Sequence, residues 1–411
     1  MREKDDGLKK ITFIGDIMCE KPLQIYVEKH GYSSFKKVFK NTKDFFEDSD
    51  YVIGNLETVF GGKECGYTRE LYNFNTPDEF ADALSQSGID MVTTATNHSL
   101  DRGIDGLIRT ISVLDERKIQ HTGTYKARED ERVFIKQVGS VKIAVVNYTY
   151  GTNVHETKVI LSKDQIFHLN LMKPQTYHLQ TYVNQQKSSK MRKLLAAFLG
   201  GILNTEQKIK IKKHLHMSYN SVRIDHLDKN ELDADYLEQI KKDIADAKTK
   251  ADFVIACIHS GGQFNADPGE FTKYMVEKIS QFGVEAIVAN HPHVVQKYDW
   301  CGKTFVAYSL GNYSISPLSV YLLHDLKPEY SVALHLYLGS KSIKKVSFSI
   351  LKIVEAEGLT VYPVDELYGQ LSAEQKNDLE KDIQFIYYRF TGVHKADLKV
   401  QHEYVILNFC E

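Results

Sequence analysis

The sequence predicts a layered α/β or α+β fold in which β-sheets are covered by helices. Short runs rich in β-branched residues alternate with amphipathic helical patterns over the first 150 residues, and the alternation resumes beyond about residue 225. Apolar residues make up 42% and charged residues 26% of the chain, the balance typical of a globular protein. The 411 residues could form one large domain or two ordinary ones.

The first part of the chain is expected to begin with strands separated by helices. Strands are expected at 11–15, 51–54 and 90–94, and helices at about 33–47, 78–87 and 104–118. Residues 133–138 and 141–147 then predict a hairpin that turns at Gly139 and Ser140.

The second part continues the same alternation and forms one domain with the first, over about residues 9–355. Its expected helices cover 232–248 and 269–282, and its expected strands cover 253–258, 285–289, 304–310, 331–337 and 344–354. The tail 356–411 is predicted to be a C-terminal helical extension. It contains a helix at 372–389, opened by Ser372, and ends in strand-like residues 404–407.

An insertion at about 153–225 interrupts the alternation. Its basic amphipathic stretch, residues 187–216, carries eight Lys or Arg against one Glu. Such a stretch is compatible with a lid over a site or with a helix on an anionic membrane surface. This pattern arises more often from a helical insertion that packs on the domain and exposes its basic face to solvent.

Charge and cysteine content restrict the class of protein. The formal net charge is −2, so we expect no nucleic-acid partner. The five cysteines show no CxxC pairing, which argues against a disulfide framework or a cysteine zinc site and favours a reducing, cytoplasmic compartment. The first apolar run is only strand length and residues 194–203 are too few to cross a bilayer, so we expect no signal peptide or membrane anchor.

Polar side chains that can bind metal follow five of the expected strands, where α/β folds place their sites. These residues are Asp16, Glu57, Asn97 with His98, His259, and His291 with His293. Each one alone is a weak signal, because a single His or Asp at a strand end is often structural. Their joint occurrence predicts one site, and imidazole with carboxylate favours Mn, Zn or Fe over Ca or Mg.

The motifs that carry these residues resemble the CapA family, whose founding members take part in poly-γ-glutamate capsule synthesis. The family belongs to the calcineurin-like metallophosphoesterase superfamily, and the resemblance runs from about residue 9 to 350, apart from the insertion. The motifs are Gly-Asp at 15–16, Asn-Leu-Glu at 55–57, Thr-Asn-His at 96–98, His-Ser-Gly at 259–261, His-Pro-His at 291–293 and Tyr-Ser-Leu-Gly-Asn at 308–312.

The resemblance implies a four-layer α-β-β-α sandwich with two metals at the strand ends. It places Asp16 and His293 on the first metal, Glu57 at the bridging position, and on the second metal Asn97, His259 and His291. His98 would face the substrate and protonate the leaving oxygen. Asp101 and Arg102 are further catalytic candidates. Arg102 would contact an anionic substrate group, although a structural contact within the loop fits equally well.

Two departures from the superfamily affect the first metal. Met18 stands where the superfamily has a His ligand, and a thioether does not replace imidazole for a hard divalent ion. Asn-Leu-Glu also replaces the usual Gly-Asp motif, and Gln263 stands where many relatives have an acidic residue. The expected cofactor is therefore one or two divalent transition-metal ions.

The resemblance implies a metal-dependent hydrolase, of phosphoesterase type, in capsule, poly-γ-glutamate or other cell-envelope polymer metabolism of a bacterium. A non-catalytic assembly component of polymer synthesis, working with other biosynthesis proteins, and an amidase on a γ-glutamyl or peptidoglycan substrate remain alternatives. The sequence has no P-loop, so ATP-driven ligation would be the work of partner proteins. An anionic small molecule or polymer is the expected substrate, and residues 187–216 are the expected contact if the protein is peripheral to the membrane.

Overall fold

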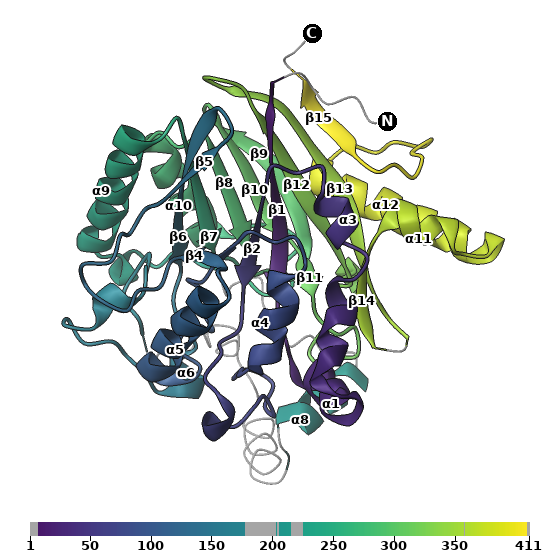
Figure 1. Cartoon of the computed structure of the whole chain (residues 1–411), viewed down its shortest axis with the longest axis horizontal. Helices are drawn as coiled ribbons and strands as arrows, with labels where there is room; N and C mark the ends of the chain where they lie inside the picture. The colour runs from purple at the N-terminus through teal and green to yellow at the C-terminus, as the bar shows by residue number, and fades with distance from the viewer. Residues whose placement is uncertain (1–6, 177–202, 204, 215–224, 357, 409–411) are drawn as a thin grey trace, which may run out of the picture.

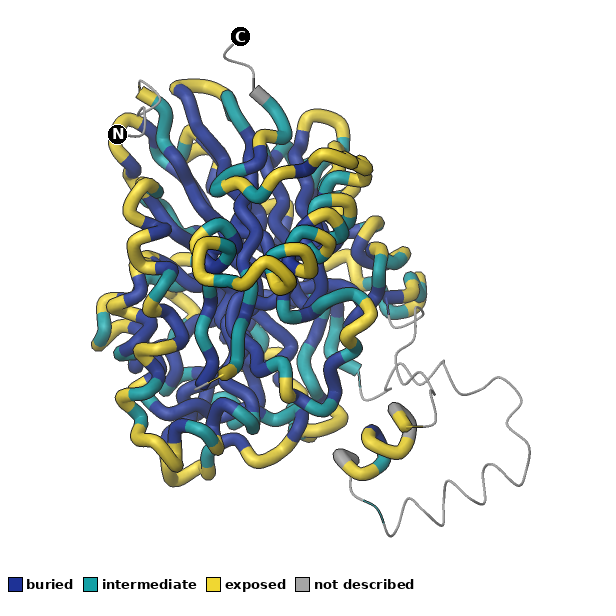
Figure 2. Tube along the Cα trace, turned by 90° about the vertical axis from the view of Figure 1, so that its right-hand side faces the viewer, coloured by how far each residue is buried: buried dark blue, intermediate teal, exposed yellow. Residues whose placement is uncertain are grey.

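Two β-sheets form the centre of the protein, and helices cover their outer faces (Figure 1). The computed structural model describes residues 7–176, 203, 205–214, 225–356 and 358–408. Buried side chains fill the interior, and the outward faces of the helices are exposed (Figure 2). Within the described part of the chain, no helix is both long and apolar enough to cross a membrane.

The first sheet has nine strands and combines a parallel half with an antiparallel half. Its main path runs β14-β13-β12-β1-β2-β3-β4, with β11 paired to β1 and β15 paired to β13. The parallel half consists of β1 (Lys9–Ile17), β2 (Tyr51–Leu56), β3 (Met91–Thr93) and β4 (Gln120–Thr122). The other strands are β11 (Asn312–Ser314), β12 (Tyr330–Leu338), β13 (Ile343–Glu355), β14 (Leu359–Pro363) and β15 (Tyr404–Asn408).

The second sheet has six strands in the order β5-β6-β7-β8-β10-β9. Its four central strands are parallel, and each edge strand is antiparallel to its neighbour. The strands are β5 (Phe134–Val138), β6 (Val141–Thr149), β7 (Phe253–His259), β8 (Ala286–Asn290), β9 (Val295–Cys301) and β10 (Thr304–Leu310). The hairpin expected at 133–147 is therefore confirmed as β5 and β6.

Three apolar clusters define the layers. Ile11 and Phe13 of the first sheet belong to the same buried cluster as Ile255 and Val288 of the second, so the two sheets pack face to face. A second cluster joins the outer face of the first sheet to α1 (Lys21–His30), α4 (Asp78–Ser85) and α5 (Gly103–Glu116). A third joins the second sheet to α9 (Ala234–Lys250) and α10 (Glu270–Gln281). The predicted α-β-β-α sandwich is confirmed.

The single helix expected at 33–47 is wrong. The segment forms three short pieces instead, a 3-10 turn at Tyr32–Phe35, α2 (Lys36–Phe39) and α3 (Lys43–Phe46). Thr42 lies at the break, where its hydroxyl bonds to the carbonyl of Phe39 and to the hydroxyl of Tyr313. A Thr side chain that bonds to the preceding turn competes with helix propagation, so the chain turns there.

The C-terminal segment contributes strands as well as helices. Besides α11 (Val364–Gly369) and α12 (Ala373–Thr391), it provides β14 and β15, which both pair with β13. Helix α12 begins at a capping box between Ser372 and Gln375. Ile383, Ile386 and Phe390 on this helix belong to the cluster between the sheets, so the segment completes the main core.

The insertion is described only in part. Its described residues include α6 (Val154–Thr157), a 3-10 turn at Ile166–His168, and α8 (Thr205–His214). Leu169 and Leu171 are buried and form bridges to Thr124 and Thr149, so this portion packs on the domain. Most of the basic stretch 187–216 lies outside the described residues, and its proposed role as a lid or membrane contact stays a prediction.

Candidate metal centre

The ends of parallel strands from both sheets meet at one edge of the sandwich. Asp16 lies near the end of β1, and Glu57 directly follows β2. From the second sheet, His259 is the last residue of β7, and His291 and His293 follow β8. Because the carboxyl ends of neighbouring parallel strands lie at the same edge, residues far apart in sequence come together there.

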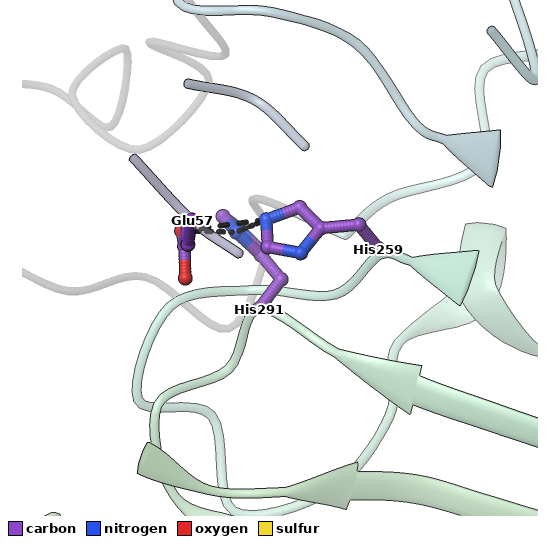
Figure 3. Close-up of side chains that lie close together, drawn as sticks. All are labelled: Glu57, His259 and His291. Carbon is purple, nitrogen blue, oxygen red and sulfur yellow. Dashed lines mark hydrogen bonds and ion pairs between the residues drawn. The ribbon is translucent and has the colours of Figure 1, made fainter. Parts of the chain in front are cut away.

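One group consists of Glu57, His259 and His291, whose side chains point toward one another (Figure 3). Glu57 Oε1 lies 3.4 Å from His259 Nε2 and 4.0 Å from His291 Nδ1. The two imidazole nitrogens are 3.1 Å apart. The side-chain oxygen of Asn97 lies 2.7 Å from His259 Nε2, so it adds a fourth donor atom to this group.

A second group consists of Asp16, Glu57 and His293. His293 Nδ1 lies 3.3 Å from Asp16 Oδ2, and His293 Nε2 lies 3.7 Å from Glu57 Oε1. Glu57 therefore belongs to both groups, with the same oxygen facing His259 on one side and His293 on the other. The side chains of both groups are buried.

Glu57 provides the test of whether a metal ion fits. The residue is 0% exposed, and neither carboxylate oxygen has a hydrogen-bond partner among the described residues. An ionised carboxylate buried without a partner is strongly destabilising, so native proteins pair it or use it to bind a metal. Carboxylate and imidazole donors together suit a divalent transition metal, and these buried groups could hold one.

The electrostatics of the cluster favour ligands in their metal-binding forms. Burial alone would raise the pKa of Glu57, but the positive potential of His293 and His259 outweighs it and lowers that pKa. Burial, together with the neighbouring His259, lowers the pKa of His291 well below its usual value, so its ring is neutral. A neutral imidazole and an ionised carboxylate are the forms that bind metal ions.

His293 and Asp16 affect each other's pKa across the 3.3 Å contact between them. Burial opposes the charged form of His293, but Glu57 and Asp16 prevail and raise its pKa to about 9. Burial and the negative charge of Glu57 raise the pKa of Asp16. His293 and Asp16 therefore hold a proton between them. A metal ion bound by the same two side chains would displace this proton.

Two asparagines that the site prediction did not include support the ligands. Asn55 Nδ2 donates to Asp16 Oδ1 at 2.8 Å and lies 3.2 Å from His259 Nδ1, so it connects the two groups. Asn312 Oδ1 lies 2.9 Å from His293 Nδ1, and Asn312 Nδ2 donates to the backbone carbonyl of His293. Both asparagines lie within the motifs quoted above, which was the available signal. Partners of this kind fix the orientation of a ligand ring.

The backbone after β8 adopts an unusual conformation at the two histidines. His291 has φ 107° and His293 has φ 58°, both on the left-handed side that non-glycine residues seldom adopt. Strain of this kind costs on the order of 1–3 kcal/mol per residue and concentrates at functional sites. The turn therefore aims both imidazoles into the cluster at a cost in stability.

His98 borders the cluster and is held from two sides. Its Nδ1 lies 2.6 Å from Asp101 Oδ2, and its ring stacks on Phe74 with centroids 4.2 Å apart. Its Nε2 lies 3.9 Å from Glu57 Oε1. Asp101 also accepts a hydrogen bond from the backbone N–H of Phe74, so the loop carrying Phe74 and the segment carrying His98 are tied together.

Arg102 and Met18 lie apart from these contacts. The Arg102 guanidinium donates to the backbone carbonyls of Asp101, Cys65 and Gly66, which is the loop contact considered as its alternative role. Met18 is buried in the apolar cluster beneath the helices of the first sheet. The structure thus brings together Asp16, Glu57, Asn97, His98, His259, His291 and His293, with Asp101 behind His98.

A cavity of about 300 Å³ opens beside the cluster. Its lining includes Asn97, His98 and His291 from the cluster and Tyr150, Lys173 and Gln263 from surrounding segments. A ligand that enters this cavity could therefore approach the donor atoms of the cluster.

The two-sheet sandwich and its buried carboxylate-imidazole cluster define an α/β protein with a candidate metal centre. The chain belongs to the family of bacterial capsule synthesis proteins PGA_cap, whose sequence model matches residues 10–316. The resemblance to the CapA family is thereby confirmed.

Two curated relatives carry capsule names. The chain is 22% identical over 317 residues to "Capsule biosynthesis protein CapA" of Bacillus anthracis, covering 76% of this chain and 61% of the relative. It is 22% identical over 311 residues to "PGA biosynthesis protein CapA" of Bacillus subtilis (strain 168), covering 75% of this chain and 63% of the relative. The match thus spans less than two thirds of the length of either relative.

Proposed function

We propose that this chain is a metal-dependent hydrolase, of phosphoesterase type, acting in the metabolism of a capsule or other cell-envelope polymer. The observation that carries the proposal is the position of Glu57. Its buried carboxylate has no hydrogen-bond partner in the part of the chain that the structure describes, and it belongs to two groups of potential ligands at once. A carboxylate shared in this way suits a pair of cations, so we assign it the bridging position.

The side chains divide into two ligand sets around Glu57. Asp16 and His293 would hold one ion, while Asn97, His259 and His291 would hold the other. Divalent cations bound there would polarise the scissile bond and lower the pKa of water at the site. We propose Mn, Zn or Fe as the ions, because the donor set mixes oxygen with imidazole nitrogen.

His98 is placed to move a proton at the cavity face of the cluster. Its contact with Asp101 occupies Nδ1, which leaves Nε2 directed toward Glu57 and the cavity. An imidazole held in this way can donate a proton to a leaving oxygen, a contribution of about 10²–10⁴-fold in rate. We therefore assign the acid role to His98 and a positioning role to Asp101.

The test uses protein stripped with a chelator and reloaded with Mn²⁺ or Zn²⁺. We expect about two ions per chain by elemental analysis and metal-dependent cleavage of bis(p-nitrophenyl) phosphate or p-nitrophenyl phosphate. His259→Ala should lose both properties, whereas His394→Gln, at an exposed histidine on the C-terminal segment, should keep both. Full activity in metal-free protein would refute the proposal.

A second candidate is an assembly component of polymer synthesis that uses the site to bind an anionic chain. The names of the two relatives concern biosynthesis, and Met18 packs in the core where the superfamily has a ligand, which together favour this reading. It predicts metal binding without hydrolysis of any phosphoester or γ-glutamyl amide. Loss of polymer in a strain carrying a metal-free, folded variant would then separate assembly from catalysis.

A further inference from the structure

Tyr150 is fixed to the metal centre through its backbone. It directly follows β6, which pairs in parallel with β7 so that Thr149 lies opposite His259. The backbone N–H of Tyr150 donates to the carbonyl oxygen of His259 at 3.0 Å. The position of Tyr150 is therefore set by the strand that delivers a proposed ligand, and the two residues move as one unit.

The Tyr150 side chain lies against a second ligand and faces the cavity. Its ring centroid is 4.9 Å from that of His291, with the planes tilted by 52°. The residue is half-buried and lines the cavity that also contains His98 and Asn97. The His291 ring thus contacts Tyr150. Its Nδ1 lies 4.0 Å from Glu57 Oε1 and 3.1 Å from His259 Nε2.

The hydroxyl of Tyr150 has no hydrogen-bond partner among the residues that the structure describes. A phenol that is largely removed from solvent ordinarily bonds to a protein group. Tyr148, two residues earlier on β6, follows this rule and donates to Asp243 Oδ2 at 2.6 Å. The difference leaves the Tyr150 hydroxyl available to a group that enters the cavity.

Two other polar groups of the cavity, Asn153 and Lys173, are already engaged. Asn153 accepts a hydrogen bond from Asn97, and its amide nitrogen lies 3.2 Å from His98 Nδ1. Lys173 Nζ lies 2.5 Å from Glu231 Oε2, so its charge is balanced within the protein. Tyr150 therefore offers an uncommitted neutral donor on the His291 side of the cavity, while His98 lies beside Glu57.

We propose that Tyr150 is a substrate-contacting residue, whose phenol donates a hydrogen bond to an oxygen of a tetrahedral oxyanion held beside His291. The assignment rests on the proposed function, because it concerns the substrate oxygen that gains negative charge during hydrolysis. The phenol keeps its proton throughout, so its contribution is stabilisation of charge. The ligand class is a phosphate-like group that presents oxygens to Tyr150 and His98 together.

The experiment measures binding of inorganic phosphate to Mn²⁺-loaded protein by calorimetry, with metal content determined in parallel. Tyr150→Phe keeps the ring against His291 and removes only the hydroxyl. We expect about tenfold weaker phosphate binding and unchanged metal content. We also expect a fall in kcat of about 10²–10³-fold that exceeds any change in KM, as for loss of one transition-state donor. Tyr308→Phe, in the outer core of the second sheet, is the matched control and should change none of these values.

The outcomes separate this inference from the proposed function. Equal phosphate affinity in Tyr150→Phe and in the unmodified chain would overturn the role of Tyr150, whether or not the protein is a hydrolase. Absence of phosphate binding to the metal-loaded unmodified chain would also overturn it. Tyr150-dependent phosphate binding without any hydrolysis would uphold the inference and refute the hydrolase.

Discussion

The imidazole Nδ1 of His98 lies 2.6 Å from the Oδ2 atom of Asp101. Because Asp101 takes up Nδ1, the other ring nitrogen is left facing Glu57 at 3.9 Å. Stacking on Phe74 fixes the plane of the ring as well. The two contacts determine which nitrogen faces the cavity and at what angle, which is the function of a carboxylate behind a catalytic histidine.

Replacing Asp101 by Asn should reduce activity while leaving metal binding intact. The amide can no longer hold the His98 ring as a charged acceptor, so we expect kcat to fall by about 10–100-fold, the usual loss for such a supporting residue. His98→Ala should cost about 10²–10⁴-fold. The measurement is the kcat and the metal content of both variants. The double variant should have the same kcat as His98→Ala alone. Additive losses would contradict a role for Asp101 through His98.

Metal removal should destabilise the unmodified chain, because a ligand that binds only the folded state adds to its stability. At a free metal concentration about 100 times Kd, the gain is about 2.7 kcal/mol, which a chelator should abolish. Glu57→Gln should remove most of this gain, since Glu57 belongs to both ligand groups. Thermal unfolding with and without metal checks this. A variant that is stabilised by metal as strongly as the unmodified chain would refute the shared position.

Glu20 should make stability depend on pH. This residue is 1% exposed, and its Oε1 accepts from Ser316 and Ser319. Its Oε2 has no hydrogen-bond partner within the described ranges. Burial raises the pKa of Glu20 from 4.5 to about 7. The folded protein therefore holds a proton that the unfolded chain has released between these two values, and folding is favoured at low pH.

The contribution of protonated Glu20 to the free energy of unfolding is fully present below pH 4.5 and is lost as pH rises through about 7. A shift of this size corresponds to about 3 kcal/mol. Relative to the unmodified chain, Glu20→Gln should gain stability between pH 5 and pH 8, measured by urea unfolding at both values. Glu64→Gln, at an exposed glutamate, should follow the unmodified chain. A constant difference between Glu20→Gln and the unmodified chain would contradict the buried proton.

Most of the layered fold could be predicted from the sequence because its strands are continuous apolar runs. The strands expected at 253–258 and 304–310 and the helix expected at 104–118 agree with β7, β10 and α5 to within one or two residues. Strand β9 was not predicted, because Val295–Cys301 alternates with charged residues at a sheet edge. The break at Thr42 depends on a tertiary contact with Tyr313, which no local pattern contains.

The candidate site could be predicted as a set of residues, and the family resemblance also implied how they divide around Glu57, but the contacts of Tyr150 and Arg102 could not be predicted. Strand-end placement was sufficient to group Asp16, Glu57 and His259, because parallel strands deliver their ends to one edge. The pattern gave no sign that Tyr150 faces the cavity, since a Tyr after a strand usually packs. Arg102 donates to the carbonyls of Cys65 and Gly66 because the loop that carries them folds beside it. No local sequence pattern contains that loop conformation.

Asp243 on α9 should be the main anchor of the strand that carries Tyr150. This carboxylate is 6% exposed and accepts from Arg132 Nε at 3.1 Å and from the Tyr148 hydroxyl at 2.6 Å. Gln239 Nε2 also donates to Asp243 Oδ1, at 2.8 Å. Asp243→Ala leaves all three donors without this acceptor, and breaking a buried pair from one side costs about 3–5 kcal/mol. Tyr148→Phe removes one neutral donor and should cost only about 1 kcal/mol.

Urea unfolding of the two variants at one pH tests this order. Because Asp243 is the acceptor of the Tyr148 hydroxyl, adding Tyr148→Phe to Asp243→Ala should cause little further loss, so the double variant should match Asp243→Ala within error. If the two losses add in full, the hydroxyl of Tyr148 is stabilised by something other than Asp243. Metal content should be unchanged in every folded variant, because the pair lies in the outer layer of the second sheet, away from the ligand groups.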